Sequence, residues 1–126
     1  KADKVWLCGI CAVPPSAEIH KSALGAEDSV EWEHVDDTME AVRRLKEDGY
    51  TIVSAEQTMQ SVMLDTFVPE KGRRYAVVFG NEVAGVSQEV VDASDIALEI
   101  PQYGTKHSLN VSVSMGVVLW HFRLHL

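Results

Sequence analysis

Short apolar runs alternate with amphipathic segments along this chain. Five runs of four to seven residues predict strands, over Lys4–Cys8, Val30–Val35, Tyr50–Ala55, Tyr75–Phe79 and Ile96–Ile100. The second run alternates polar and apolar residues, as an edge strand does, whereas the fourth is apolar throughout, as in a central strand covered on both faces. Helical segments between the runs predict an α/β fold with a mostly parallel sheet flanked by helices.

The clearest surface helix is predicted over Asp36–Gly49. Its apolar residues share one face, acids occupy its first turn, and Gly49 stands where a left-handed residue ends a helix. Shorter helices are expected over Ser16–Ala23 and Ser87–Asp92, the latter capped by Ser87. Leu64–Arg74, with its proline and glycine, is predicted to be a loop.

The last helix, predicted over Leu109–Phe122, is apolar around nearly its whole circumference. Only Asn110, Ser112, Ser114, Gly116 and His121 interrupt the apolar positions. A helix that is apolar on all sides must be buried. In so short a chain, this predicts packing onto the sheet on one side and onto a partner subunit on the other.

Composition and charge narrow the function classes. The 126 residues, 46% of them hydrophobic, predict one domain over residues 1–126 that needs no disulfide or metal. The net charge of −8 argues against coating nucleic acid by bulk charge, so an RNA partner needs a local basic patch. No apolar run is long enough to span a membrane and no signal pattern is present, which favours a cytoplasmic protein. Neither end has a natural lead-in, so we expect the chain to be part of a larger protein.

Two loops carry the candidate chemistry, because each follows a buried strand at its carboxyl end, where α/β sheets bind ligands. In Phe79–Ser87 (FGNEVAGVS), glycines 80 and 85 allow the backbone to approach a ligand, and Glu82 lies between them. The same glycines also suit an ordinary turn, and no P-loop lysine follows them. In Ile100–Ser112 (IPQYGTKHSLNVS), Ser108 and Asn110 precede the apolar helix, where they can also act as plain caps.

Together the two loops resemble the SpoU (TrmH-type) family of SPOUT methyltransferases. The similarity is strong from Tyr75 to about Trp120 and looser upstream, over Asp3–Leu7 and Lys21–Ala26. It implies an α/β fold with a C-terminal trefoil knot, a homodimer formed through the C-terminal helix, and methylation of the ribose 2′-hydroxyl of tRNA or rRNA. The cofactor that it implies is S-adenosylmethionine.

By position, the resemblance assigns roles to individual residues. Those expected to bind the cofactor, largely through backbone groups, are Val78, Phe79, Gly80, Ile100, Pro101, Gly104 and Leu109. Those expected to organise the ribose and the catalytic group are Glu82, Ser108 and Asn110. Methyl transfer is an in-line displacement, so these polar groups would position the 2′-oxygen and help to remove its proton.

One departure from the family pattern bears on activity. The family's first motif, with an Asn and an activating Arg, should lie just before Val5 and is not in this chain; Arg43 and Arg44 do not match it. We therefore expect the 126-residue chain to bind S-adenosylmethionine but to transfer methyl groups poorly.

The cysteines, the histidines and the basic residues give weaker indications of function. Cys8 and Cys11 form a lone C-x-x-C, interpreted as a strand and a loop cysteine, and the histidines lack metal-ligand spacing, so no metal is expected. Basic residues that can face RNA are Lys71, Arg73, Arg74 and Lys106, although an ordinary solvated loop explains them nearly as well. Two alternatives stay open: a non-catalytic, dimeric RNA-binding module on the same fold, and a generic nucleotide-binding α/β enzyme.

Overall fold

A computed structural model describes residues 3–9, 15–17, 30–58, 60–80, 85–101 and 111–126. Most of the helix predicted over Ser16–Ala23 and the start of the predicted last helix lie outside these residues. By its internal contacts the chain divides into two units, Lys1–Arg43 and Arg44–Leu126. Each unit is described by itself.

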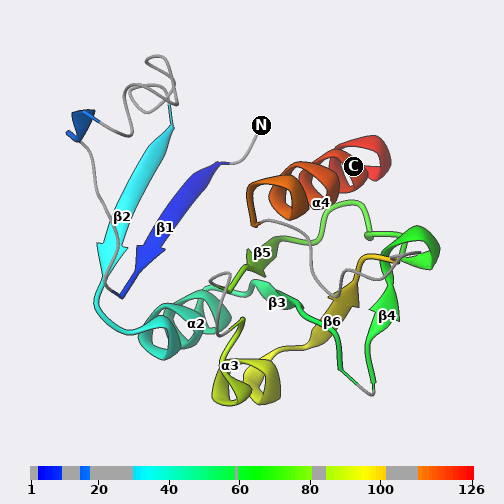
Figure 1. The fold of residues 1–126 in the computed structure, drawn as a ribbon, viewed down its shortest axis with the longest axis horizontal. Helices are drawn as coiled ribbons and strands as arrows, with labels where there is room; N and C mark the ends of the chain where they lie inside the picture. Colours follow the sequence, from blue (N-terminus) through cyan, green and yellow to red (C-terminus); the bar gives the residue numbers. More distant parts are fainter. Residues whose placement is uncertain (1–2, 10–14, 18–29, 59, 81–84, 102–110) are drawn as a thin grey trace. The chain divides into compact units, whose positions relative to one another are not determined.

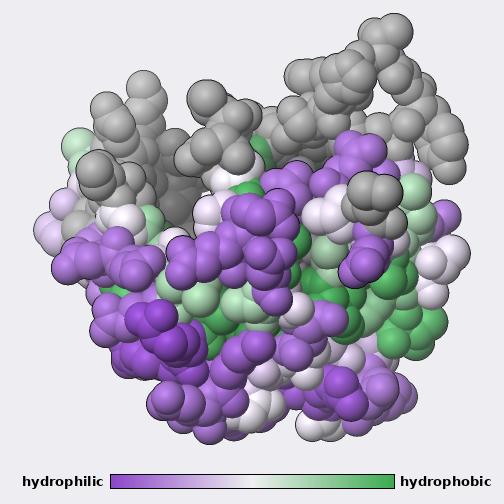
Figure 2. All heavy atoms as spheres, turned by 90° about the horizontal axis from the view of Figure 1, so that it is seen from below, coloured by the Kyte–Doolittle hydropathy of each residue, from purple (hydrophilic) through white to green (hydrophobic). Residues whose placement is uncertain are grey.

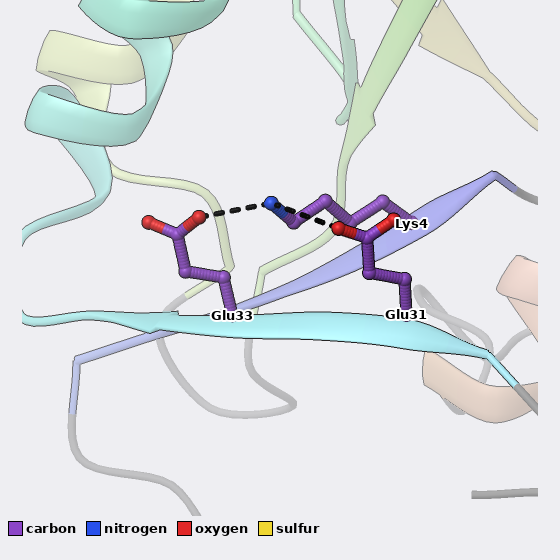
Figure 3. Close-up of polar contacts among 3 residues, drawn as sticks. All are labelled: Lys4, Glu31 and Glu33. Carbon is purple, nitrogen blue, oxygen red and sulfur yellow. Dashed lines mark hydrogen bonds and ion pairs between the residues drawn. The ribbon is translucent and has the colours of Figure 1, made fainter. Parts of the chain in front are cut away.

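The first unit contains two parallel strands, β1 (Lys4–Cys8) and β2 (Glu31–Val35). The ammonium group of Lys4 lies between two carboxylates of β2, at 2.9 Å from Glu33 and 3.8 Å from Glu31 (Figure 3). The two glutamates share one face of the strand because side chains alternate with a period of two. The same ammonium lies 5.0 Å from the ring centroid of Trp6, also on β1. The two ion pairs therefore join β1 and β2 by charge in addition to backbone pairing.

Helix α2 (Thr38–Glu47) runs across the boundary between the units and has the ends that its sequence predicts. The Asp37 carboxylate accepts a hydrogen bond from the Met39 amide at 3.1 Å, which satisfies one free N–H group of the first turn. At the other end Gly49 has a φ of +87°, and the amides of Gly49 and Tyr50 donate to the carbonyls of Lys46 and Leu45. This is a Schellman ending, which the predicted position of Gly49 anticipated.

The second unit is built on a four-stranded parallel sheet (Figure 1). Its elements in chain order are β3 (Thr51–Ala55), β4 (Val62–Met63), the short 3-10 helix η2 (Leu64–Thr66), β5 (Tyr75–Val78), α3 (Gln88–Ala93), β6 (Ile96–Glu99) and α4 (Val111–His125). The strand order is β4-β6-β3-β5, and every pairing is parallel. The prediction of an α/β fold with parallel strands and flanking helices is therefore confirmed.

Strand order corrects one expectation. The apolar strand β5, expected at the centre, lies at an edge of the described four-stranded sheet, and β3 lies inside it. In β3, Ile52, Val53 and Ser54 are all fully buried. The hydroxyl of Ser54 is hydrogen-bonded to the Ser94 hydroxyl, which donates to the Val90 carbonyl at 2.7 Å. A buried polar group with a partner costs little, so Ser54 does not exclude a central strand.

A short strand was missed in the segment before the predicted loop. Strand β4 has two residues, Val62 and Met63, which are 42% and 41% exposed and lie at the other edge of the sheet. Figure 2 shows mostly hydrophilic side chains on one face of the molecule, with hydrophobic side chains gathered toward the right, the side where Figure 1 draws β4. Two exposed residues give no periodic signal, so sequence patterning could not detect this strand.

The two faces of the sheet are covered by different helices. On one face, Val53 and Leu98 belong to a core cluster with Val118 and Phe122 of α4. On the other face, Ser54 contacts Ser94 at the end of α3, a helix capped by the Ser87 hydroxyl as predicted. Because neighbouring residues of a strand point to opposite faces, β3 holds both layers together.

Helix α4 is only partly buried in the single chain. Val118 is fully buried and Phe122 is 7% exposed, so the expected packing onto the sheet is confirmed. The apolar residues of α4 left exposed by 39% to 65% are Val113, Val117, Leu119, Trp120 and Leu124. These residues lie on the side of α4 that does not meet the sheet, where packing onto a partner subunit is expected, and that expectation stays a prediction.

Candidate functional site

The carboxyl ends of β3, β5 and β6 lie along the same side of the sheet because all three strands are parallel. We call this row of strand ends the carboxyl edge. Ser54 of β3 is aligned with Val78 of β5 and with Ala97 of β6. Since β3 lies between them, the ends of β5 and β6 are two strand spacings apart, about 10 Å. Parallel α/β sheets bind ligands outside this edge.

The structure brings five of the predicted cofactor residues to this edge. Val78 is the last residue of β5, and Phe79 and Gly80 follow it. Ile100 and Pro101 follow β6, and the side chains of Phe79 and Ile100 pack, half-buried, against the core of the second unit. The edge thus combines apolar side chains with backbone groups of two strand ends, a surface that suits an aromatic ring with polar edges.

Several predicted site residues lie outside the described residues. They are Glu82, Gly104, Lys106, Ser108, Leu109 and Asn110. Their roles remain predictions, and they are flanked in the chain by described residues at the ends of β5 and β6 and at the start of α4.

The first glycine of the loop after β5 is required by close packing. A Cβ atom on Gly80 would overlap the main chain of Gly85 and Val86. Gly85 has a φ of +68°, a conformation that side chains with a Cβ atom rarely adopt. The two ends of this loop therefore touch. An ordinary turn does not require so close an approach of its ends.

The structure adds Glu56, which sequence reasoning missed. It follows β3 directly, and its Oε2 accepts a hydrogen bond of 2.9 Å from the Val86 amide in the loop after β5. Its own amide donates to the Leu98 carbonyl of β6 at 3.0 Å. The available signal was an acid directly after a buried apolar strand, a position with the same logic that singled out the two loops.

A shallow apolar groove of about 260 Å³ adjoins the end of β6. It is lined by Leu64, Asp65, Ile100, Pro101, Val117, Trp120, His121 and Leu124. The His121 Nε2 lies 2.5 Å from the Phe67 carbonyl oxygen, which ties α4 to the segment after η2. The groove therefore joins two predicted cofactor residues to the exposed side of α4.

Three of the predicted RNA-facing basic residues lie at the amino end of β5, away from the carboxyl ends of the strands. Lys71, Arg73 and Arg74 precede the first residue of β5, whereas the candidate site follows its last residue. Arg73 forms an ion pair of 2.9 Å with Glu70. Arg74 donates to the Asp48 carbonyl at 3.1 Å and lies 4.1 Å from the Tyr50 ring centroid. The structure does not bring this patch together with the strand ends.

The described residues contain neither a cluster of metal ligands nor a helix that could span a membrane. Cys8 ends β1, and its Sγ lies 3.9 Å from the Trp6 carbonyl oxygen, while Cys11 lies outside the described part. No cluster of three or more potential ligands from His, Cys, Asp and Glu occurs within the described ranges. No helix among the residues that the structure describes could cross a membrane.

Comparison with known sequences gives a match that spans nearly the whole chain. The model of the SpoU rRNA Methylase family matches residues 1–120. A tRNA (guanosine(18)-2′-O)-methyltransferase from Borreliella burgdorferi is 36% identical over 86 residues, which are 68% of this chain and 38% of that protein. A 23S rRNA (guanosine-2′-O-)-methyltransferase from Nitrosomonas europaea is 40% identical over 119 residues, 90% of this chain and 43% of that protein. The chain thus spans less than half the length of these two relatives.

Solved structures agree with the sequence matches. An AdoMet-bound rRNA methyltransferase from Sinorhizobium meliloti superposes with a TM-score of 0.89 at 26% identity, over 99% of this chain and 47% of that one. A TrmH/SpoU tRNA-modifying enzyme from A. aeolicus, 23% identical, shares the fold with a TM-score of 0.80, over 99% of this chain and 76% of that one. Because the family model matches residues 1–120, the chain belongs to the SpoU rRNA Methylase family.

Proposed function

We propose that this protein transfers a methyl group from S-adenosylmethionine to the ribose 2′-hydroxyl of a tRNA or rRNA nucleotide. The observation that carries the proposal is the superposition with the AdoMet-bound S. meliloti rRNA methyltransferase over 99% of the chain. The names of the B. burgdorferi and N. europaea relatives support a 2′-O-methyltransferase acting on RNA. A non-catalytic RNA-binding module has no comparable support.

The residues at the strand ends fit this cofactor. Phe79 and Ile100 offer half-buried apolar surface for a ring, and the chain around Gly80 and Pro101 offers backbone groups for its polar edge. Gly104 and Leu109 complete the proposed binding set. S-adenosylmethionine supplies an electrophilic methyl group on its sulfonium. In this proposal the chain positions the cofactor mainly by backbone contacts.

The polar residues of the two loops serve the RNA ribose in this proposal. Glu82, Ser108 and Asn110 orient the 2′-hydroxyl in line with the methyl group and help to remove its proton. Lys106 belongs to the loop after β6 and would meet a backbone phosphate near the ribose. Lys71 and Arg73 lie before the first residue of β5, at the opposite end of that strand from the candidate site. In this proposal they contact RNA farther from the modified nucleotide.

Calorimetric titration of the chain with S-adenosylmethionine tests the proposal. We expect saturable binding with about one cofactor per chain, because each chain carries one set of strand-end loops. An Asn110→Ala variant is titrated beside it, and its heat of binding shows whether Asn110 acts on the cofactor or on the RNA. A folded chain that binds no S-adenosylmethionine would contradict the proposal and favour the RNA-binding module.

The proposal also includes one methyltransferase domain over residues 1–126, a C-terminal trefoil knot, a cytoplasmic location and a homodimer that forms through α4. Support for the dimer is an apolar stripe with a helical spacing of four, three and four residues, formed by Val113, Val117, Trp120 and Leu124. These side chains are 39% to 65% exposed on one side of α4, while Val118 and Phe122 face the core. An exposed stripe of this kind is typical of a helix that meets another helix.

Trp120→Glu is expected to convert a dimer into a monomer. The substitution removes a large side chain that the proposed dimer buries, and it places an unpaired carboxylate in the middle of an apolar interface. The dimer should therefore weaken at least about thirtyfold. Sedimentation velocity over a range of concentrations measures the change. Arg123→Gln, an exposed substitution on the same helix outside the stripe, serves as the control. A wild-type chain that stays monomeric, or a Trp120→Glu chain that still dimerises, would rule out this interface.

A further inference from the structure

We propose that Glu56 is a positioning residue, whose carboxylate holds the loop after β5 in the conformation that binds the cofactor. The inference rests on the proposed function for the identity of that cofactor. It assigns to Glu56 a role that neither of the two signature loops contains.

The contacts of Glu56 join three segments that are distant in sequence. Its carboxylate Oε2 accepts from the Val86 amide at 2.9 Å, thirty residues along the chain. Its Oε1 accepts from the Gln57 amide at 3.1 Å, and its own amide donates to Leu98 of β6 at 3.0 Å. Glu56 thereby links the end of β3 to β6 through its backbone and to the β5 loop through its side chain.

The glycines of the loop show how closely this carboxylate approaches. A Cβ atom on Gly85 would lie 2.5 Å from the Glu56 Oε2, a separation that no real Cβ contact tolerates. A Cβ atom on Gly80 would in turn overlap the main chain of Gly85. The Glu56 carboxylate therefore lies directly against Gly85, and Gly85 lies directly against Gly80.

The chemistry of the contacts explains why a carboxylate suits this task. A backbone N–H donating to an ionised oxygen makes a stronger hydrogen bond than one donating to a neutral oxygen. A loop without such a contact retains conformational freedom that must be lost when a ligand binds. By holding the loop before binding occurs, Glu56 reduces this entropic cost.

The role is positioning and not catalysis. Both carboxylate oxygens accept from main-chain amides of the protein itself, at Gln57 and Val86. The carboxylate of Glu82, between the two loop glycines in sequence, is the one that the family resemblance assigns to the reaction. Glu56 would act on the cofactor only through the backbone of the loop.

A substitution series in the full chain tests the inference, with cofactor binding measured by calorimetry at a temperature where all variants are folded. Glu56→Ala removes both acceptors and should weaken S-adenosylmethionine binding about tenfold, while Glu56→Gln keeps one acceptor and should weaken it less. Glu47→Gln, which removes an exposed carboxylate at the end of α2, should bind as the wild type does. Amide exchange at Val86 should accelerate in Glu56→Ala and stay slow in Glu47→Gln.

The outcomes separate this inference from the proposed function. A folded Glu56→Ala chain that binds the cofactor as tightly as Glu47→Gln would overturn the positioning role. A purely structural role would lower the unfolding free energy and leave the dissociation constant of the folded variant unchanged. Failure of the wild type to bind contradicts the proposed function, and unchanged Val86 exchange in Glu56→Ala then also overturns the hold on the loop.

Discussion

Replacing Gly80 with alanine is expected to abolish most cofactor binding and to destabilise the second unit. The added Cβ atom would overlap the main chain of Gly85 and Val86, and neither can rotate away as a flexible side chain would. Relief requires that the loop after β5 move away from the strand end. Displacing these backbone groups breaks hydrogen bonds to the ligand, each worth about 0.5–1.5 kcal/mol, so the loss of two or three should weaken binding by roughly 100-fold. The overlap itself should cost about 1–3 kcal/mol of unfolding free energy, the range found for overpacked sites.

The two effects are measured by calorimetric titration with S-adenosylmethionine and by urea unfolding. Gly116→Ala is the matched control, because a Cβ atom on Gly116 of α4 would meet nothing within 4 Å. Alanine in the interior of a helix should stabilise the chain by about 0.5–1 kcal/mol relative to glycine. If Gly80→Ala unfolds at the wild-type urea concentration and binds the cofactor normally, the close approach of Gly80 to Gly85 is not required.

Local patterns were sufficient to predict most elements of the fold. The acidic start of α2 and its end at Gly49, and the Ser87 cap of α3, depend on neighbours within a few residues. Helices and buried strands differ in hydrophobic period over such distances, so the sequence alone locates them. The strand over Lys4–Cys8 has the predicted bounds, and the other four predicted strands are one residue shorter, because pairing with a neighbour, and not hydrophobicity, decides where a strand stops.

Strand order was beyond the reach of these patterns. Tyr75–Val78 is more apolar than Thr51–Ala55, yet the latter lies inside the sheet. The difference is made by contacts that are distant in sequence, such as Ser54 with Ser94 and the Ile52 amide with the Asp95 carboxylate at 2.8 Å. A polar residue with such a partner reads as a surface residue until its partner is known.

The candidate site shows the same division. The two loops could be identified because each is one continuous segment with a family pattern. Glu56 could not, since its partner Val86 is thirty residues away and becomes a neighbour only through the pairing of β3 with β5. Without that pairing, nothing in the sequence distinguishes Glu56 from a solvated acid in the turn after a strand.

Phe122→Ala is expected to remove a large fraction of the stability of the second unit. Phe122 is 7% exposed, and its ring centroid lies 5.9 Å from that of Phe67 and 5.2 Å from that of Tyr75. Phe67 and Tyr75 are themselves in edge contact at 6.2 Å, so the three rings connect α4, the segment after η2 and β5. Truncating a buried phenylalanine costs about 3–5 kcal/mol through lost burial and the cavity left behind. Net stabilities of natural domains are of the order of 5–15 kcal/mol, so the loss is a large fraction of the total.

Urea unfolding followed by far-ultraviolet circular dichroism measures this loss. Val68→Ala is the control, because Val68 is 66% exposed and its truncation should change the unfolding free energy by less than about 0.5 kcal/mol. Phe122→Leu keeps much of the buried volume and should lose clearly less than alanine, since it forfeits the edge contacts between the rings but leaves a smaller cavity. If alanine at 122 costs no more than alanine at 68, the three rings do not hold α4 on the sheet. The exposed stripe on the other side of α4 would then lack a fixed support from which to meet a second chain.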